Sequence, residues 1–156
     1  DALPISIFDK VNLGDVINRE NIWVNPDFYY KEQILDQEIQ RMIDQGYVKP
    51  EFLLSVYKRE GVMTTYLKGG IAIPHGDTDL VTKPVISITK LATPVLWDGI
   101  NTVDIIFVLA LDKDSKIYFE QLYKIISDES LILAIRNSNS IEEILEILHI
   151  HTESDR

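Results

Sequence analysis

Gly69-Gly70-Ile71-Ala72-Ile73-Pro74-His75-Gly76 places a histidine between a proline and a glycine. Pro74 fixes its own φ and favours an extended conformation at Ile73, whereas Gly76 tolerates backbone angles that other residues avoid. The preceding Gly-Gly pair allows a tight turn into the segment. These residues therefore predict a short buried strand over residues 71–73, which ends in a stiff corner that presents one imidazole.

The same stretch resembles a known signature. Enzyme IIA (EIIA) domains of the mannitol/fructose type, from the bacterial phosphoenolpyruvate-dependent sugar phosphotransferase system (PTS), have the motif Gly-Ile-Ala-Ile-Pro-His-Gly, which residues 70–76 match without a substitution. The likeness extends over residues 20–149 and includes the run Arg-Glu-Gly-Val-Met-Thr-Thr-Tyr-Leu at 59–67 and Ser-Asp-Glu at 127–129. Since the family's histidine carries a phosphoryl group, the resemblance implies that His75 is the phosphoacceptor.

Composition agrees with a small cytoplasmic domain. The chain has 156 residues, 46% hydrophobic and 26% charged, which is typical of one globular domain. It has no cysteine, so disulfides, a thiolate nucleophile and cysteine-ligated metals are excluded. A net charge of −10 argues against nucleic-acid binding by this domain, and no apolar run is long enough to insert into a membrane.

Hydrophobic periodicity predicts alternating strands and helices. The expected strands are 22–24, 71–73, 85–91, 95–97 and the almost continuously apolar 103–111; the expected helices are 31–45, 50–59, 117–126, 128–136 and 141–148. This order predicts an α/β fold, and the resemblance specifies a layered α/β/α sandwich with a central mixed β-sheet flanked by helices. We expect an N-terminal segment or linker (1–20), the EIIA-like domain (21–149) and a disordered tail (150–156).

The resemblance implies further site residues around His75. The family has an arginine at the position of Arg59, and a guanidinium suits phosphate oxygens, although a solvated helix end is the usual fate of an arginine there. Thr64 and Thr65 are weaker candidates for hydroxyl contacts, since either can simply order the loop. Backbone N–H groups around Gly76 are further candidates for binding the phosphoryl oxygens.

One position departs from the family. Many members of the mannitol type have a second histidine near the first, and this position corresponds to Ser115 here. His149 and His151 do not replace it, because they are expected to be exposed and disordered at the chain end. The substitution puts efficient onward transfer in doubt without removing the phosphoacceptor.

The loop after His75 contains two carboxylates, Asp77 and Asp79. Their spacing lacks the further histidines or carboxylates of a zinc centre, so we predict no metal site, and nothing in the sequence calls for a cofactor.

Three functions fit a reactive histidine at this corner. As a transport component, the domain would accept a phosphoryl group from phospho-HPr and pass it to an EIIB domain, which makes it a phosphotransferase. As part of a transcription regulator or antiterminator, it would be a regulatory phosphoacceptor that acts on sister regulatory domains. The start at Asp1, the first twenty residues, Ser115 and the run 119–123 favour the regulator. A hydrolase with His75 as general base is disfavoured, because no Gly-x-Ser-x-Gly motif occurs.

Overall fold

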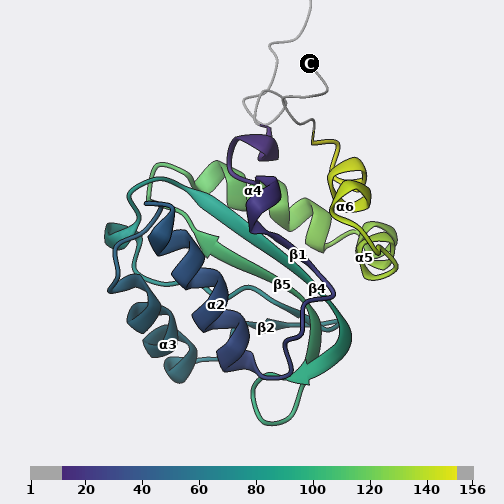
Figure 1. The fold of residues 1–156 in the computed structure, drawn as a ribbon, viewed down its shortest axis with the longest axis horizontal. Coiled ribbons are helices and arrows are strands. Elements are labelled where there is room, and N and C mark those ends of the chain that lie inside the picture. The colour runs from purple at the N-terminus through teal and green to yellow at the C-terminus, as the bar shows by residue number, and fades with distance from the viewer. Residues whose placement is uncertain (1–11, 151–156) are drawn as a thin grey trace, which may run out of the picture.

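The computed structural model describes residues 12–150. A five-stranded mixed sheet forms its centre, in the order β1-β4-β5-β3-β2 (Figure 1). The strands are β1 (Ile22–Val24), β2 (Tyr66–Leu67), β3 (Ile71–Ala72), β4 (Val85–Leu96) and β5 (Thr102–Ala110). The helices are α2 (Lys31–Asp44), α3 (Phe52–Val62), α4 (Lys116–Ile126), α5 (Glu129–Arg136) and α6 (Ile141–Ile147), with short 3-10 turns η1 (Leu13–Asp15), η2 (Arg19–Asn21) and η3 (Thr78–Leu80).

Strand directions are mixed across the sheet. β1 runs parallel to β4, and β3 runs parallel to β5, whereas the pairs β4–β5 and β2–β3 are antiparallel. The pairing of β3 with β5 places the segment that contains His75 beside the central strand. The predicted α/β fold with a central mixed sheet is confirmed.

The side chains of β5 explain the layers. Ile105, Phe107 and Leu109 pack into one hydrophobic core, while Ile106, Val108 and Ala110 pack into a second core on the opposite face. A strand segment that is buried on both faces needs apolar residues at successive positions, and residues 105–110 are all apolar and buried. α2 and α3 cover the second core, and α4, α5 and α6 cover the first (Figure 1).

Both faces of β4 are buried over residues 85–91, and one of them carries two hydroxyl side chains. Ile86 and Ile88 face the helices α4 to α6, whereas the hydroxyls of Ser87 and Thr89 form hydrogen bonds with the carboxyl group of Glu38 of α2. Glu38 is completely buried, and desolvation raises its pKa to about 7 against the opposing effect of the two hydroxyls and Arg41. Polar groups in this layer therefore satisfy one another.

Several predicted boundaries differ from the structure. α3 begins at Phe52 instead of Pro50 and continues past Arg59 to Val62, because Gly61 remains helical. β4 continues through Pro94 to Leu96, with a register shift between Lys90 and Val95 that accommodates the proline. β3 ends at Ala72, one residue early, and β5 spans 102–110 instead of 103–111.

Both ends of the described chain pack against the domain. Leu13, Val16 and Ile17, from the predicted N-terminal segment, and Ile150, from the predicted tail, are buried in the core. His149 is exposed. Residues 1–11 and 151–156, including His151, lie outside the described residues.

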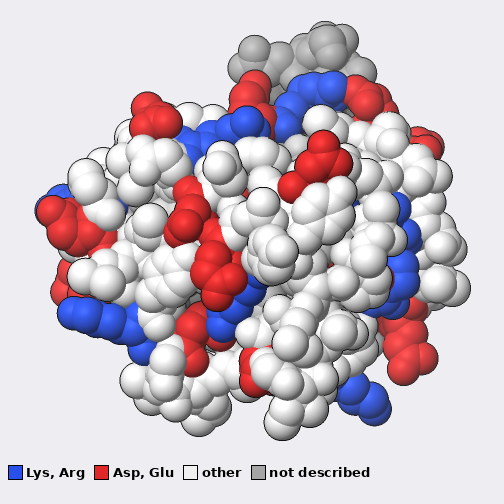
Figure 2. Space-filling model, turned by 60° about the horizontal axis from the view of Figure 1, so that its bottom comes forward, with Lys and Arg blue, Asp and Glu red and all other residues white. Residues whose placement is uncertain are grey.

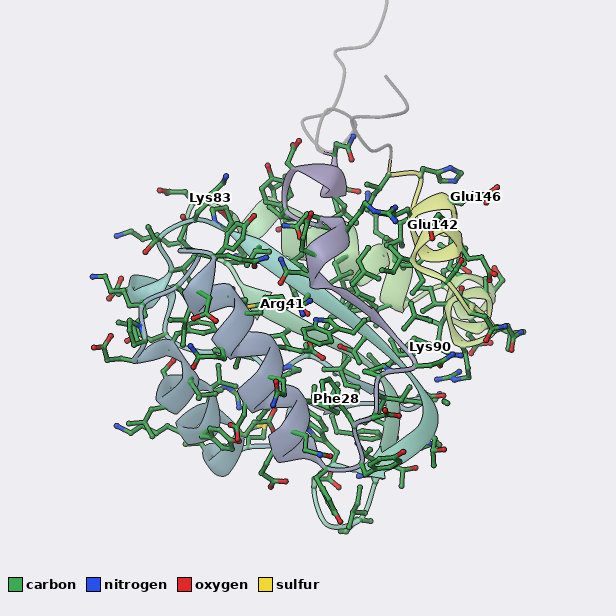
Figure 3. All side chains as sticks on the ribbon, viewed as in Figure 1. Phe28, Arg41, Lys83, Lys90, Glu142 and Glu146 are labelled. Atoms are coloured by element: carbon green, nitrogen blue, oxygen red, sulfur yellow. The ribbon has the colours of Figure 1, made fainter. Side chains whose placement is uncertain are left out.

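Charged side chains are interspersed with uncharged ones on the face that Figure 2 shows. Figure 3 places Arg41 on α2 and Glu142 on α6. Arg41 lies over the Trp23 ring of β1, 3.9 Å from its centroid, and Glu142 pairs with Arg19.

No helix within residues 12–150 has the length and hydrophobicity needed to cross a bilayer.

Candidate functional site

The imidazole of His75 is held by its own backbone. Its Nδ1 lies 2.9 Å from the carbonyl oxygen of Ile73, two residues earlier. Because a carbonyl can only accept a hydrogen bond, this contact places the proton of a neutral ring on Nδ1 and the lone pair on Nε2. The half-buried ring therefore has a fixed tautomer with Nε2 as its basic nitrogen.

Two neighbouring strands hold the corner that carries this ring. The N–H of Leu109 in β5 donates to the Pro74 carbonyl at 2.9 Å, and His75 forms an isolated parallel bridge with Leu109. On the other side, the N–H of Ile73 donates to the Thr65 carbonyl at 3.1 Å. The corner is thus an extension of β3, paired on both edges.

Gly76 lets helix α3 approach the corner closely. A Cβ at this position would overlap Ser55 Oγ and would lie 3.0 Å from Val56 Cγ2 and 3.2 Å from Phe52 Cε1. Ser55 Oγ also accepts a hydrogen bond from the N–H of Asp77 at 3.0 Å and donates one to the Phe52 carbonyl. A residue larger than glycine at position 76 would therefore collide with side chains of α3.

His75 faces a cleft of about 400 Å³ between the corner and the start of α4. One wall is apolar, and the remaining lining is polar or charged. The lining residues are Ile73, His75, Gly76, Thr78, Leu109, Leu111, Asp112, Lys113, Lys116 and Phe119. One histidine, two lysines and one aspartate therefore contribute to the lining of the same space.

Of the other predicted site residues, only Gly76 lines this cleft. Arg59 Nη1 donates to the Met63 carbonyl at 2.7 Å. Thr65 is buried, and its N–H and hydroxyl both donate to Glu60, while Thr64 Oγ1 accepts from the N–H of Tyr66 at 3.1 Å. Ser115 is buried before α4, where its hydroxyl donates to Asp112 at 2.7 Å.

Sequence reasoning missed the two lysines of the cleft. Lys113 and Lys116 lie three residues apart where the loop after β5 enters α4. They line the same cleft as His75 because the parallel β3–β5 contact brings the carboxyl ends of both strands together. A lysine pair at a strand-to-helix junction after the central strand is the signal that could have found them.

The loop after the corner is organised by Asp77. Its side chain accepts from the N–H of Asp79 at 2.9 Å and caps η3. Across residues 12–150, no three histidine, aspartate or glutamate side chains gather closely enough to hold a metal ion.

Fold and site define an α/β domain that presents a single histidine of fixed tautomer at a cleft beside its central sheet. The chain belongs to the family "phosphoenolpyruvate-dependent sugar phosphotransferase system, EIIA 2", whose model matches residues 15–150. The predicted family is confirmed.

Relatives include proteins of very different length. The mannitol-specific phosphotransferase enzyme IIA component of Bacillus subtilis is 27% identical over 86% of this chain and 96% of its own length. The 2-O-alpha-mannosyl-D-glycerate-specific EIIABC component of Escherichia coli K12 is 26% identical over 88% of this chain. The chain spans only 22% of that relative's length.

The similar solved structures include mannitol enzymes IIA as well. The crystal structure of IIA mannitol from E. coli has a TM-score of 0.74 at 26% identity, covering 84% of this chain and 97% of that one. The E. coli enzyme IIA mannitol in complex with phosphorylated enzyme IIB mannitol has a TM-score of 0.76 at 25% identity, covering 86% and 99%.

Proposed function

We propose that this domain accepts a phosphoryl group on Nε2 of His75 and passes it on in sugar uptake. The observation that carries the proposal is the hydrogen bond from Nδ1 to the Ile73 carbonyl, which leaves the Nε2 lone pair free to attack phosphorus. The proposed donor is the phosphohistidine of HPr. As the new P–N bond forms, the donor's P–N bond breaks, and its electron pair stays on the donor nitrogen.

The transfer needs no proton relay. The proton stays on Nδ1 throughout, hydrogen-bonded to the Ile73 carbonyl, and the carbonyl dipole stabilises the positive charge that develops on the ring. Positioning and charge stabilisation supply most of the catalysis of phosphoryl transfer. In this domain the corner that carries His75 is hydrogen-bonded to the chain on both sides, and it thereby positions the imidazole.

A phosphoryl group on His75 adds about two negative charges, by analogy with other phosphorylated side chains. Backbone N–H groups around Gly76 and the guanidinium of Arg59 are proposed to bind its oxygens. Arg59 would have to release the Met63 carbonyl in order to do so. Thr64, Thr65 and Ser115 are proposed to act on the surrounding loops, since their hydroxyls have partners there.

The proposed acceptor is an EIIB domain. Support comes from the structure of a similar enzyme IIA in complex with phosphorylated enzyme IIB, and from a relative whose name combines EIIA with EIIB and EIIC functions. The regulator or antiterminator alternative stays a prediction from the sequence.

The test is phosphorylation with phosphoenolpyruvate, enzyme I and HPr, followed by intact mass. We expect a gain of one acid-labile phosphoryl group in the wild type and none in His75→Ala. Addition of a mannitol-type EIIB domain should then remove the group from this domain and place it on EIIB. Phosphorylation of His75→Ala would contradict the proposed acceptor, and loss of the group to water alone would contradict onward transfer.

A further inference from the structure

Two lysines in the His75 cleft have no partner. Lys113 and Lys116 are exposed, and the side chain of neither forms a hydrogen bond or an ion pair with any residue in the range 12–150. Three other cations of the described residues have acidic partners: Arg136 pairs with Asp104, Arg19 with Glu142 and Lys31 with Glu60. The two free ammonium groups therefore set the local charge of the cleft.

This local charge opposes that of the whole protein. The chain carries a net charge of −10, yet the cleft contains two lysines and one carboxylate, that of Asp112. Oδ1 of that carboxylate is already occupied, because it accepts from the Ser115 hydroxyl at 2.7 Å and from the N–H of Asp114 at 3.0 Å. The cleft is thus suited to an anion.

The wall of the cleft strengthens this effect. Ile73, Leu109, Leu111 and Phe119 line it with apolar surface. A low-dielectric wall displaces water and makes the attraction between an ammonium group and an anion larger than it is in bulk solvent. His75 lies in the same lining, so an anion attached to its ring lies within this field.

We propose that Lys113 and Lys116 clamp the phosphoryl group on His75 and are its principal cationic contacts in the cleft. This inference rests on the proposed function, and it adds two cationic contacts to the one proposed for Arg59. In this structure the Arg59 guanidinium donates to the Met63 carbonyl and does not line the cleft, whereas both lysines belong to the lining.

Lysine suits a group that has to arrive and leave. An ammonium group is a compact point charge on a flexible stem, whereas a guanidinium fork fixes a planar geometry. Two such stems can follow the phosphoryl group from the donor nitrogen to Nε2 of His75. They contact its oxygens only, and the bonds to phosphorus form and break at the two histidines.

The experiment compares Lys113→Gln, Lys116→Gln and the double variant with Lys58→Gln. Lys58 is an exposed lysine of α3 outside the cleft lining, so this control removes one charge without touching the site. Each protein is phosphorylated with phosphoenolpyruvate, enzyme I and HPr, and the acceptance rate is measured at limiting and at saturating phospho-HPr. The phosphorylated proteins are then titrated by phosphorus-31 NMR.

We expect the double variant to accept the phosphoryl group about tenfold more slowly at saturating donor, since charge stabilisation in the transition state is lost. Its phosphoryl titration midpoint should rise by about half a pH unit or more, because nearby cations favour the more charged form. Lys58→Gln should match the wild type in both measurements.

Three results would overturn the inference. If the double variant matches the wild type in rate and titration while His75→Ala stays unphosphorylated, the clamp is wrong and the proposed function stands. If only the rate at limiting donor falls, the lysines serve donor docking and do not contact the phosphoryl group. If the wild type accepts no phosphoryl group, the proposed function and the clamp fail together.

Discussion

At the scale of single residues, the chemistry of the His75 ring depends on a backbone carbonyl two residues earlier in the chain. The Ile73 carbonyl that fixes the ring belongs to a residue whose N–H is itself bound to Thr65. Pro74 and Gly76 predict a corner from sequence alone, because their backbone preferences are local. The tautomer could not be predicted, since it depends on which carbonyl the folded corner directs at the ring.

Gly76→Ala should destabilise the domain, because the new methyl group would overlap Ser55 Oγ and press on Val56 and Phe52. Overpacking of this kind costs about 1–3 kcal/mol of unfolding free energy. Urea denaturation of both single variants and of the double variant Ser55→Ala/Gly76→Ala measures it. The double variant should be more stable than the sum of the single effects predicts; strict additivity would contradict the close approach.

At the scale of elements, α3 and the β2–β3 hairpin hold the corner through Glu60. Its buried carboxylate accepts from the N–H and the hydroxyl of Thr65, and Lys31 Nζ of α2 lies 3.4 Å away. Thr65 in turn accepts from Ile73, so a chain of contacts leads from α2 to the ring of His75.

Glu60→Ala should leave the N–H of Thr65 and its hydroxyl buried without partners, at a cost of about 1–3 kcal/mol of unfolding free energy. The looser corner should also weaken the hydrogen bond at Nδ1 of His75. Nitrogen-15 NMR of the imidazole should then show a larger share of the tautomer protonated on Nε2.

Glu38→Gln is the matched control for this prediction, because Glu38 is also a buried carboxyl but faces β4. It should leave the His75 tautomer unchanged. If Glu60→Ala lowers stability without any change in the imidazole spectrum, Glu60 supports the fold and does not position the ring.

Prediction of the elements from sequence succeeded where periodicity was strong and failed where a local signal conflicted with tertiary contacts. The stripe of Ile34, Leu35, Ile39 and Met42 predicted α2 closely. The sequence predicted two strands, 85–91 and 95–97, but the register shift in β4 lets one strand continue through Pro94 beside β5. The lysines of the cleft escaped prediction because the packing of the corner against the junction of β5 and α4 brings them to His75.

At the scale of the whole molecule, Glu38 connects stability to pH. Ser87 Oγ lies 2.7 Å from Glu38 and 3.1 Å from the Asn21 carbonyl, and its single proton can serve only one of them. The Thr89 hydroxyl supplies a second proton, so a protonated carboxyl completes the set of three hydrogen bonds. Geometry and the raised pKa of about 7 both indicate a neutral carboxyl between α2 and β4 at mildly acidic pH.

Stability should therefore fall as the pH rises. The folded-state pKa of Glu38 is about 7 against 4.5 as its ordinary value, so its contribution is fully present below pH 4.5 and is lost as the pH passes through 7. The difference corresponds to about 3 kcal/mol, at about 1.4 kcal/mol per pKa unit. Glu38→Gln keeps a donor and an acceptor in place and should remove this slope.

Urea denaturation of the wild type and of Glu38→Gln between pH 5 and pH 8.5 measures the effect. The variant should lose less stability than the wild type over this range. Identical slopes for the two proteins would show that Glu38 is ionised in the folded state throughout.

The most direct test of the account is the site of phosphorylation on the imidazole. Nitrogen-15 and phosphorus-31 NMR of the domain phosphorylated by phospho-HPr should place phosphorus on Nε2 of His75, with Nδ1 still protonated against the Ile73 carbonyl. Phosphorus on Nδ1, or on any residue other than His75, would contradict it.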